Sequence, residues 1–308
     1  MRVGFIGLGT MGASMALNVR AAGYDIVVND IRREVSAPHL QAGATSVDSA
    51  RKVAEDADVV FTSLPGPREV EEVALAEDGL LAGMRRGTAW FDLSTNSPTV
   101  VRRLHERFAA KGIAMLDSPV SGGPAGAKSR KLALWVSGER AAFDSHKPVL
   151  DAIGDQAMYV GPIGAGTVAK LVHNAAGYAI LAALAEVFTL GVKAGVEPLV
   201  LWQAVRQGAF GRRRTFDRLA EQFLPHLFDP AAFALKLAHK DITLATELGR
   251  ELNVPLRIAT LVHEELTEAL NRGWGERDSR IFMLLQEERA GVDIAVPADE
   301  VQQVLAHR

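Results

Sequence analysis

A glycine-rich turn near the start of the chain constrains the fold more than any other feature. Gly7, Gly9 and Gly12 follow the G-x-G-x-x-G spacing directly after the apolar run 2–6, and a helical pattern then leads to a second apolar run, 25–29. The motif alone is a weak signal, but its place between two predicted strands matches the unit that binds dinucleotides. The first glycine permits the tight turn, the second lets the backbone approach a pyrophosphate, and the third lets helix and strand pack closely. We therefore predict a dinucleotide site at this turn.

Short apolar runs alternate with helical patterns through the first half of the chain. These runs cover residues 2–6, 25–29, 59–63, 89–93, 114–116 and 132–136. Such alternation predicts a doubly wound, mostly parallel sheet with helices on both faces, which is an α/β fold of the Rossmann type.

Beyond about residue 160 the strand signals end and only helical patterns follow. They cover residues 165–194, 199–207, 215–223, 231–252, 258–272 and 279–288. We predict a dinucleotide-binding Rossmann domain over residues 1–162, followed by an all-α substrate and dimerisation domain over residues 163–308. The first of these helices is apolar almost all round, which indicates a helix surrounded by protein. The polar stretch 292–308 is expected to be partly ordered at best.

The composition narrows the class of protein. The chain has 308 residues, no cysteine and a net charge of −3. Without cysteine there are no disulfides, thiolate nucleophiles or cysteine-ligated metals, and the balanced charge gives no reason to expect a nucleic-acid partner. The first residues show no signal-peptide pattern, and the apolar run 175–185 is too short to cross a bilayer. We expect a cytoplasmic protein with no membrane partner, and no metal, because no His, Asp and Glu cluster has metal-ligand spacing.

The residues that end the second predicted strand bear on the choice of cofactor. Asn29, Asp30 and Ile31 lie there, and Asp30 is placed to accept hydrogen bonds from the adenosine ribose hydroxyls. A carboxylate at this position favours NAD because it repels a 2′-phosphate. Arg32 and Arg33 follow at once, and an arginine near this position can accept that phosphate. We expect NAD as the cofactor, with NADP as the alternative.

Four short segments stand out, in order, along residues 2–290. They are Gly7-Leu8-Gly9-Thr10-Met11-Gly12, Asp117-Ser118-Pro119-Val120-Ser121-Gly122-Gly123, Gly161-Pro162-Ile163-Gly164-Ala165-Gly166 with the later Lys170 and Asn174, and Lys240-Asp241. In this order they resemble the β-hydroxyacid dehydrogenases, a family that includes 3-hydroxyisobutyrate dehydrogenase and tartronate semialdehyde reductase. One position departs from the family pattern. Arg130 stands where the family usually has glycine, in the loop expected to close over the substrate.

The resemblance implies roles for the second and third segments. Ser121, Gly122 and Gly123 bind the acid group of the substrate, because small residues let backbone N–H groups face a carboxylate. Lys170 and Asn174 are catalytic, and their spacing of four places them on one helix face. A partly desolvated lysine has a lowered pKa and can exchange a proton with the substrate hydroxyl, while Asn174 orients the lysine or the substrate.

The resemblance also implies contacts to the dinucleotide. Two loops at the carboxyl ends of predicted strands take part, where open parallel sheets bind ligands. Lys240 and Asp241 lie near the nicotinamide, and Lys240 also near the substrate. The position of Lys236, one turn earlier on the same helix face, leaves two interpretations open: it meets a second acidic group of the substrate, or it faces solvent. The remaining implied contacts are Leu8, Thr10 and Met11 in the turn, and Leu64, Pro65 and Thr95 in the two loops.

Two further features stay open. His173 lies three residues after Lys170, and we interpret it as a packed or hydrogen-bonding helix residue rather than a general base. The run Arg212-Arg213-Arg214 is interpreted as a solvated surface patch. The alternative for this run is that one arginine binds a carboxylate, sulfonate or phosphate of the substrate.

Together these residues predict an NAD(P)-dependent oxidoreductase. It would transfer a hydride between nicotinamide and a small anionic β-hydroxy acid, or its aldehyde-acid or keto form, with Lys170 as the general acid and base. An imine reductase is the main alternative enzyme, although enzymes of that group often lack this lysine. A dinucleotide-binding redox sensor without turnover is the alternative of another class. The apolar helix after residue 165 also predicts a homodimer or homotetramer.

Overall fold

The computed structural model describes residues 1–208, 211–213, 216–251, 253 and 255–306, with side chains for all of these except 186, 187, 190, 213, 216 and 217. The chain forms two compact units, Met1–Val172 and His173–Arg308. This division falls inside one long helix, whereas the predicted domain boundary lies at residues 162 and 163. That boundary stays a prediction.

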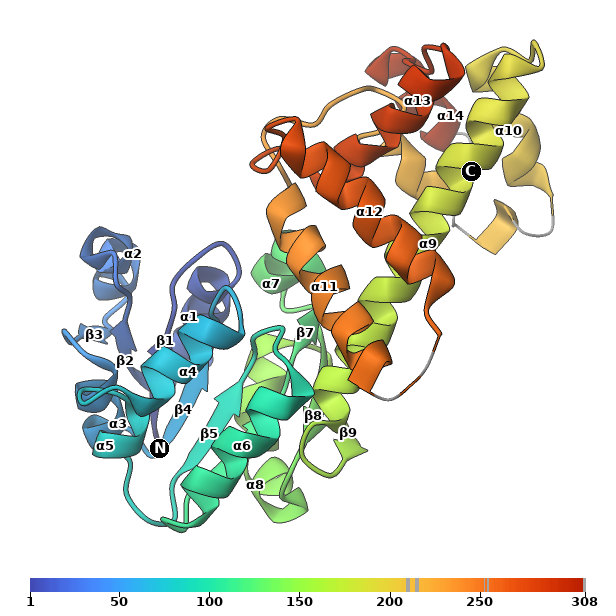
Figure 1. The fold of residues 1–308 in the computed structure, drawn as a ribbon. Helices are drawn as coiled ribbons and strands as arrows, with labels where there is room; N and C mark the ends of the chain where they lie inside the picture. The colour runs from blue at the N-terminus through green and yellow to red at the C-terminus, as the bar shows by residue number, and fades with distance from the viewer. Residues whose placement is uncertain (209–210, 214–215, 252, 254, 307–308) are drawn as a thin grey trace. The chain divides into compact units, whose positions relative to one another are not determined.

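The first unit is built on one twisted, mostly parallel sheet (Figure 1). Its strand order is β3-β2-β1-β4-β5-β6-β8-β7, and β9 pairs with β8. The pairs from β3 to β6 are parallel, while β8 runs antiparallel to β6 and β7. The strands are β1 (Arg2–Ile6), β2 (Asp25–Asn29), β3 (Thr45–Ser46), β4 (Val59–Thr62), β5 (Ala89–Asp92), β6 (Ala114–Asp117), β7 (Val120–Ser121), β8 (Ala133–Ser137) and β9 (Gln156–Gly161).

All six predicted strands are confirmed, with ends that shift by at most one residue. Three strands were not predicted, and each has a physical reason. The strands β3 and β7 have only two residues each, which is too short for a periodic signal. The strand β9 lies at the sheet edge and has no fully buried residue, so its sequence lacks the apolar pattern that marks a core strand.

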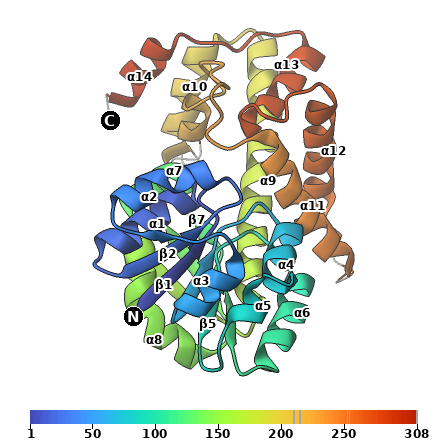
Figure 2. The same cartoon turned by 90° about the vertical axis from the view of Figure 1, so that its left-hand side faces the viewer.

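Helices cover both faces of this sheet, as expected. Phe5, Phe61 and Phe91 stack along one face, against α1, α7 and α8. Trp90 and Phe108 pack on the other face, among α3 to α6, and Figure 2 shows α4 beside α6. The helices of this unit are α1 (Gly12–Ala21), η1 (Arg33–Ser36), α2 (Ala37–Gln41), α3 (Ala50–Asp56), α4 (Pro67–Leu75), α5 (Leu80–Gly83), α6 (Pro98–Ala109), α7 (Gly123–Ser129) and α8 (Arg140–Ile153).

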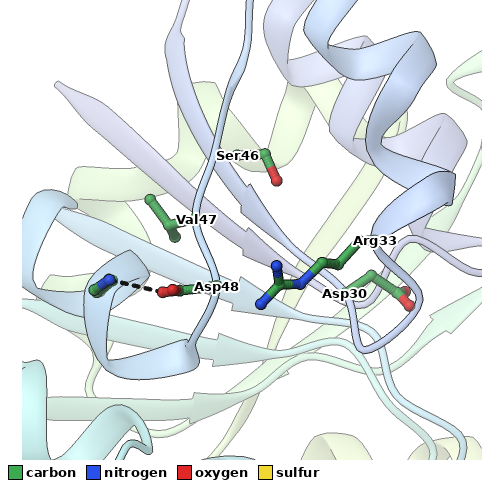
Figure 3. Close-up of a pocket in the computed structure, with 6 residues that line it drawn as sticks. Asp30, Arg33, Ser46, Val47 and Asp48 are labelled. Atoms are coloured by element: carbon green, nitrogen blue, oxygen red, sulfur yellow. Dashed lines mark ion pairs between the residues drawn. The ribbon is translucent and has the colours of Figure 1, made fainter.

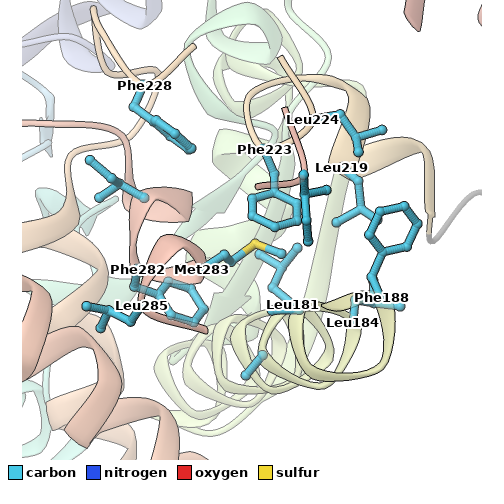
Figure 4. Close-up of a cluster of buried hydrophobic side chains, with 14 of the residues drawn as sticks. Leu181, Leu184, Phe188, Leu219, Phe223, Leu224, Phe228, Phe282, Met283 and Leu285 are labelled. Carbon is cyan, nitrogen blue, oxygen red and sulfur yellow. The ribbon is translucent and has the colours of Figure 1, made fainter. Parts of the chain in front are cut away.

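The second unit is helical in every element described. Its core joins apolar side chains of α9 to those of the segment 219–228 and of η4 (Figure 4), and α11 packs against α12. The elements are α9 (Ala165–Lys193), which begins in the first unit, α10 (Pro198–Gln207), η2 (Gly211–Arg213), η3 (Phe216–Ala220), α11 (Leu235–Glu251), α12 (Arg257–Asn271), η4 (Ser279–Met283), α13 (Leu284–Ala290) and α14 (Ala298–Ala306).

Three predictions for this half need correction. In the described part of 215–223 only the 3-10 helix η3 forms, followed by turns. The helix predicted from 231 begins at Leu235, because the buried Asp278 carboxylate accepts the N–H groups of Ala232 and Phe233. The stretch after 292 is more ordered than expected: it forms α14 and buries apolar side chains up to Val301, while 307–308 lie outside the described residues.

The helix α9 follows its prediction to within one residue but differs in burial. Its segment Ala165–Ala185 is long and apolar enough to cross a membrane by length and composition, which corrects the expectation that the apolar run is too short. Core helices of globular proteins share this length and composition. Only 28% of the segment is buried inside the chain, so this chain alone does not surround the helix as expected.

Candidate dinucleotide and substrate site

Three glycines shape the turn between β1 and α1. Gly7 has a φ of +91°, and a Cβ there would lie 2.3 Å from the carbonyl oxygen of Ser63. A Cβ on Gly12 would lie 1.9 Å from the carbonyl oxygen of Gly7, whereas a Cβ on Gly9 would meet nothing within 4 Å. Backbone packing therefore requires the first and third glycines, while the second leaves open space where the turn enters α1.

Asp30 ties the end of β2 to this turn. Its Oδ2 accepts a hydrogen bond from the Leu8 N–H at 2.7 Å, and its Oδ1 accepts one from the Arg32 N–H at 2.8 Å. Beside it, Asn29 donates from Nδ2 to the carbonyl oxygen of Val47 at 2.8 Å, so its side chain holds the sheet edge. Each carboxylate oxygen of Asp30 keeps a second lone pair that a ribose hydroxyl can use.

The other predicted contacts in this region differ in exposure. The Leu8 side chain is buried in the sheet core, Met11 is half-buried, and Thr10 is exposed at the turn. Ile31 is 97% exposed. An apolar side chain this exposed has its whole surface available to pack against a ligand.

A hollow of about 320 Å³ opens beside Asp30 (Figure 3). Arg33 extends towards Asp48, whose Oδ1 pairs with Lys52 Nζ at 2.8 Å. The hydrogen bond and charge of Lys52 lower the pKa of Asp48, so Asp48 is ionised at neutral pH. Two acidic and two basic side chains thus face the hollow, and their charges cancel. The lining residues are Asp30, Arg33, Ser46, Val47, Asp48 and Lys52.

A buried polar network holds the loops after β4 and β5. The Leu64 N–H donates to Ser94 Oγ at 2.9 Å, and Asp92 accepts the Ser94 N–H at 3.2 Å and Asn96 Nδ2 at 2.9 Å. Burial raises the pKa of Asp92, and the hydrogen bonds from its neighbours oppose that shift. The network sets the backbone path of the predicted cofactor contacts, of which Leu64 and Thr95 are half-buried and Pro65 is exposed.

The predicted substrate segment joins β7 to α7. Ser121 ends the strand half-buried, and Gly122 and Gly123 have φ values of +138° and +63°. A Cβ on Gly122 would lie 2.9 Å from the carbonyl oxygen of Lys131, whereas a Cβ on Gly123 would meet nothing within 4 Å. Gly122 is thus required for packing, and Gly123 leaves open space at the start of α7.

Arg130, the departure from the family pattern, caps the end of α7. It has a φ of 60°, its N–H donates to the carbonyl oxygen of Gly126, and its Nε reaches Asn18 Oδ1 at 3.4 Å. This left-handed conformation is the one that glycine adopts most readily at a helix end. The helix therefore ends as it would with glycine, and the arginine side chain lies along α1.

One buried carboxylate connects the substrate segment to the start of α9. Asp117, at the end of β6, is 1% exposed. Its Oδ1 accepts the Gly164 N–H at 2.8 Å, and its Oδ2 accepts the N–H and Oγ1–H of Thr167 at 2.6 and 2.8 Å. Ser137 Oγ also donates to Oδ1. Asp117 thus caps α9 while the chain runs on from it to Ser121.

Backbone packing also fixes the start of α9 against the sheet. A Cβ on Gly166 would lie 2.2 Å from the carbonyl oxygen of Trp135, so only glycine fits in this first turn of α9. Lys170 follows one turn later and is half-buried. The structure therefore brings the substrate segment and the helix turn before Lys170 to one carboxylate, Asp117, within the first unit.

In the second unit, the structure brings together three of the predicted site residues. Asn174 Nδ2 donates to Asp241 Oδ2 at 2.6 Å, and Lys240 Nζ lies 2.9 Å from Asp241 Oδ1. Asp241 is 2% exposed. Because the amide of Asn174 donates to this carboxylate, its carbonyl oxygen remains as an acceptor for a hydroxyl or ammonium group.

The remaining candidates lie elsewhere. Lys236 pairs with Glu276 at 2.7 Å on the surface, so its charge is already matched. His173 is exposed on α9. Arg212 donates from Nε to the carbonyl oxygen of Gln207 at 2.8 Å. Of the other two arginines in that run, the side chain of 213 and all of 214 lie outside the described residues.

One cluster was not anticipated from sequence spacing. His226, Glu287 and Asp293 have ligand atoms that lie within 4.8 Å of one another, a grouping that can hold a metal ion. His226 Nε2 already pairs with Glu287 Oε1 at 3.0 Å. His226 lies 61 positions before Glu287, which explains why spacing gave no signal.

Two family models match the chain. Residues 2–161 match the NAD-binding domain of 6-phosphogluconate dehydrogenase. Residues 164–286 match the NAD-binding domain of NADP-dependent 3-hydroxyisobutyrate dehydrogenase.

Named relatives match over nearly the whole chain. 2-(Hydroxymethyl)glutarate dehydrogenase of Eubacterium barkeri is 34% identical over 96% of this chain and 98% of its own. NAD-dependent L-serine dehydrogenase of Pseudomonas aeruginosa is also 34% identical, over 94% of this chain and 99% of its own. The solved structure of Mycobacterium tuberculosis 3-hydroxyisobutyrate dehydrogenase with L-serine superposes with a TM-score of 0.82, at 27% identity, over 92% and 98% of the two chains. An imine reductase from Pseudomonas, at 17% identity and a TM-score of 0.60, shares the fold alone.

Proposed function

The chain belongs to the β-hydroxyacid dehydrogenase family, and we propose that it oxidises or reduces a small hydroxy acid with Lys170 as the proton-transfer group. The observation that carries the proposal is the Asp117 junction, which joins the turn before Lys170 to the substrate segment. An NAD(P) cofactor, when bound, supplies or accepts the hydride. The imine reductase alternative has only a likeness of fold behind it.

Proton transfer falls to Lys170. In the oxidative direction its neutral amine takes the proton of the substrate hydroxyl as the hydride leaves the same carbon, so a carbonyl forms. In the reductive direction its ammonium returns that proton to the oxygen. Asn174, whose Nδ2 is held by Asp241, offers its carbonyl oxygen to the substrate hydroxyl or to Lys170.

The carboxylate of the substrate is assigned to Ser121, Gly122 and Gly123. The open space at Gly123 supports this role, because a carboxylate can approach backbone there without meeting a side chain. Lys240 is assigned to the substrate and nicotinamide, and Asp241 to holding Lys240 and Asn174 in place.

NAD is the proposed cofactor. The dinucleotide is assigned to the glycine turn, to Asp30 and Ile31, and to the loops at Leu64, Pro65 and Thr95. The charges of the four ionised side chains that line the hollow beside Asp30 cancel, and Arg32 is already paired with Asp30, its Nε lying 3.7 Å from Oδ1. This balance suits a neutral ribose hydroxyl better than a 2′-phosphate with its two negative charges. Arg33 is the side chain that can accept the 2′-phosphate of NADP. We therefore expect NADP to bind, but more weakly than NAD.

The relatives narrow the substrate class. Those named above act on 2-(hydroxymethyl)glutarate and L-serine, and others are named for 3-hydroxyisobutyrate and 2-hydroxy-3-oxopropionate. Each name describes a short acid with a hydroxyl or carbonyl close to its carboxylate. We assign the same class to this chain.

A panel of such acids, each with NAD and with NADP, tests the proposal by absorbance at 340 nm. We expect turnover with at least one acid and a larger kcat/KM with NAD. Cofactor binding without turnover on any acid would instead favour a redox sensor.

The proposal also covers the assembly of the protein, its location and its domain boundary. A homodimer or homotetramer is supported by the low burial of α9 in one chain. A cytoplasmic location is supported by the absence of cysteine, which fits a reducing compartment. A boundary between domains at residues 162 and 163 is supported by family models that end at 161 and begin at 164.

A further inference from the structure

We propose that Arg218 binds a second acidic group of the substrate, so that the enzyme prefers dianionic hydroxy acids over monoanionic ones. This inference rests on the proposed function and names its substrate class. The groups that fit are a distal carboxylate, a sulfonate or a phosphonate, because a guanidinium binds all three through paired N–H groups.

The position of Arg218 is set by buried neighbours. It lies in the 3-10 helix η3, directly before Leu219 and Ala220, which are 0% and 3% exposed. These side chains belong to the core that also holds Leu181 and Leu184 of α9 (Figure 4). The short helix is therefore anchored on α9, and Arg218 leaves it as an exposed side chain.

The guanidinium of Arg218 lies against α9 at Gly177. A Cβ built on Gly177 would lie 3.8 Å from Arg218 Nη1, which is ordinary contact, and outside the backbone of α9 no other described atom lies within 4 Å of it. A glycine inside a helix lowers helix stability, but it also brings the helix surface closer to whatever packs there. Apart from the guanidinium, no described atom of another element packs on this glycine, so a ligand can approach the guanidinium along the helix.

Gly177 adjoins a residue proposed to act on the substrate. It is three residues after Asn174, so the two share one side of the helix. Three residues of helix rise about 4.5 Å. The distal acid of a five-carbon diacid whose hydroxyl meets Asn174 can cover this distance, whereas a three-carbon hydroxy acid has no second acidic group to do so.

The electrostatic surroundings of Tyr178 place the charge of Arg218 in the same neighbourhood. Burial and the negative charges of Asp241 and Asp278 raise the pKa of the Tyr178 phenol, and the positive charges of Arg280 and Arg218 oppose that shift. Asp241 is the residue that holds Asn174. Arg218 therefore lies close enough to act on the charges around the proposed site.

Arg218 and Arg280 differ in what they already bind. Arg280 pairs with Glu221 at 3.0 Å and with Asp278 at 3.3 Å, which makes it a structural residue. Among the described residues, no acidic side chain forms an ion pair with Arg218. Its charge is thus available to an acidic ligand that lies along α9.

A matched pair of substrates tests this inference. 2-(Hydroxymethyl)glutarate carries two carboxylates, and 2-(hydroxymethyl)pentanoate has a methyl group in place of the distal one. We expect Arg218→Gln to lower kcat/KM for the diacid by about 10- to 100-fold and to change that for the monoacid by less than about threefold. Arg218→Lys should retain part of the preference for the diacid, because lysine keeps the positive charge but lacks the planar guanidinium with its paired N–H groups.

The control is Arg212→Gln, since Arg212 lies in the same stretch but donates to its own backbone at Gln207. It should leave the ratio of the two kcat/KM values unchanged. Equal losses on both substrates, or no loss on either, after Arg218→Gln would overturn the inference and leave the proposed function intact.

Calorimetry separates the two proposals. If neither acid is turned over with NAD or NADP, the proposed activity on this class of substrate fails. The binding of glutarate and of butyrate, each measured in the presence of NAD, then decides the role of Arg218. Tighter binding of glutarate that Arg218→Gln abolishes would support the inference. Equal binding of the two acids by the unaltered protein would overturn it.

Discussion

A single side chain, Lys170, carries the proton chemistry proposed for this chain. It is half-buried on α9, one turn beyond the part of the helix that Asp117 holds. No other predicted site residue can both take and return a proton at this place on the helix, because Asn174 has no titratable group.

We expect Lys170→Ala to lower kcat by about 10²- to 10⁴-fold, the usual contribution of a general acid or base. NAD affinity should stay within about twofold, because the dinucleotide is assigned to other residues. Steady-state kinetics and a fluorescence titration with NADH measure the two quantities. His173→Gln, three residues away and exposed, is the control and should keep near-normal turnover. Near-normal turnover of the Lys170 variant would remove the proposed role.

The start of α9 is the element on which the site depends most. Asp117 accepts hydrogen bonds from Gly164, Thr167 and Ser137, and all of these donors are buried. An asparagine in its place has one acceptor oxygen, and its NH₂ group would face donors on the other side. The first turn of α9 would then lose its cap.

Asp117→Asn should therefore lower the free energy of unfolding by about 2 to 3 kcal/mol, the cost of leaving buried donors unpaired. The kcat should also fall, because Lys170 follows this turn. Asp144→Asn removes an exposed carboxylate that pairs with Arg140, and should change stability by less than about 0.5 kcal/mol. Chemical denaturation measures both variants, and equal stabilities would contradict the assignment.

A side-chain hydrogen bond also joins the 224–228 segment to α13. His226 donates to Glu287, which is 5% exposed, and this hydrogen bond raises the pKa of the histidine, with Asp293 adding a smaller charge effect. Since the folded pKa lies above the unfolded one, the link stabilises the fold fully below pH 6.5 and loses its effect as pH rises through the folded pKa.

The unfolding free energy of the unaltered protein should therefore fall by about 1 kcal/mol between pH 6 and pH 8 relative to that of His226→Gln. Urea denaturation at the two pH values checks this difference. Parallel pH dependence in the two proteins would show that the His226–Glu287 pair does not contribute.

Local sequence patterns allowed most helices and strands to be predicted, but contacts between residues distant in the sequence could not be predicted from them. The glycine turn and the six core strands have periodic or motif signals within a few residues. Asp117 meets Thr167 across 50 positions, and Asn174 meets Asp241 across 67, so no spacing rule reveals them. The place of Arg218 beside Gly177 likewise depends on tertiary packing. Strand β9 was missed because an edge strand without buried residues has no apolar signature.

At the scale of the whole molecule, α9 leaves a stripe of apolar surface uncovered. Val172 and Ile180, eight residues apart on one side of the helix, are 62% and 43% exposed. Apolar side chains at this spacing form a continuous surface that is suited to a partner helix. A second copy of the chain is the proposed partner.

Light scattering in detergent-free buffer should give a dimer or a larger even assembly. Ile180→Lys should shift the mass towards the monomer, because a charge in an apolar interface is costly to bury. Leu40→Lys, on α2 and 49% exposed, is the control and should leave the mass unchanged. A monomeric unaltered protein would refute the proposed assembly, and a need for detergent would point to a membrane.

The single helix α9 also limits how this enzyme can be recombined with its relatives. It begins in the first compact unit and continues through the second, and Lys170 and Asn174 fall on opposite sides of the division. Their alignment is inherited from one unbroken helix rather than from the docking of two parts. A chimera spliced before Ala165 should therefore keep both side chains in register, whereas an inserted or deleted residue between them would rotate one by about 100° from the other.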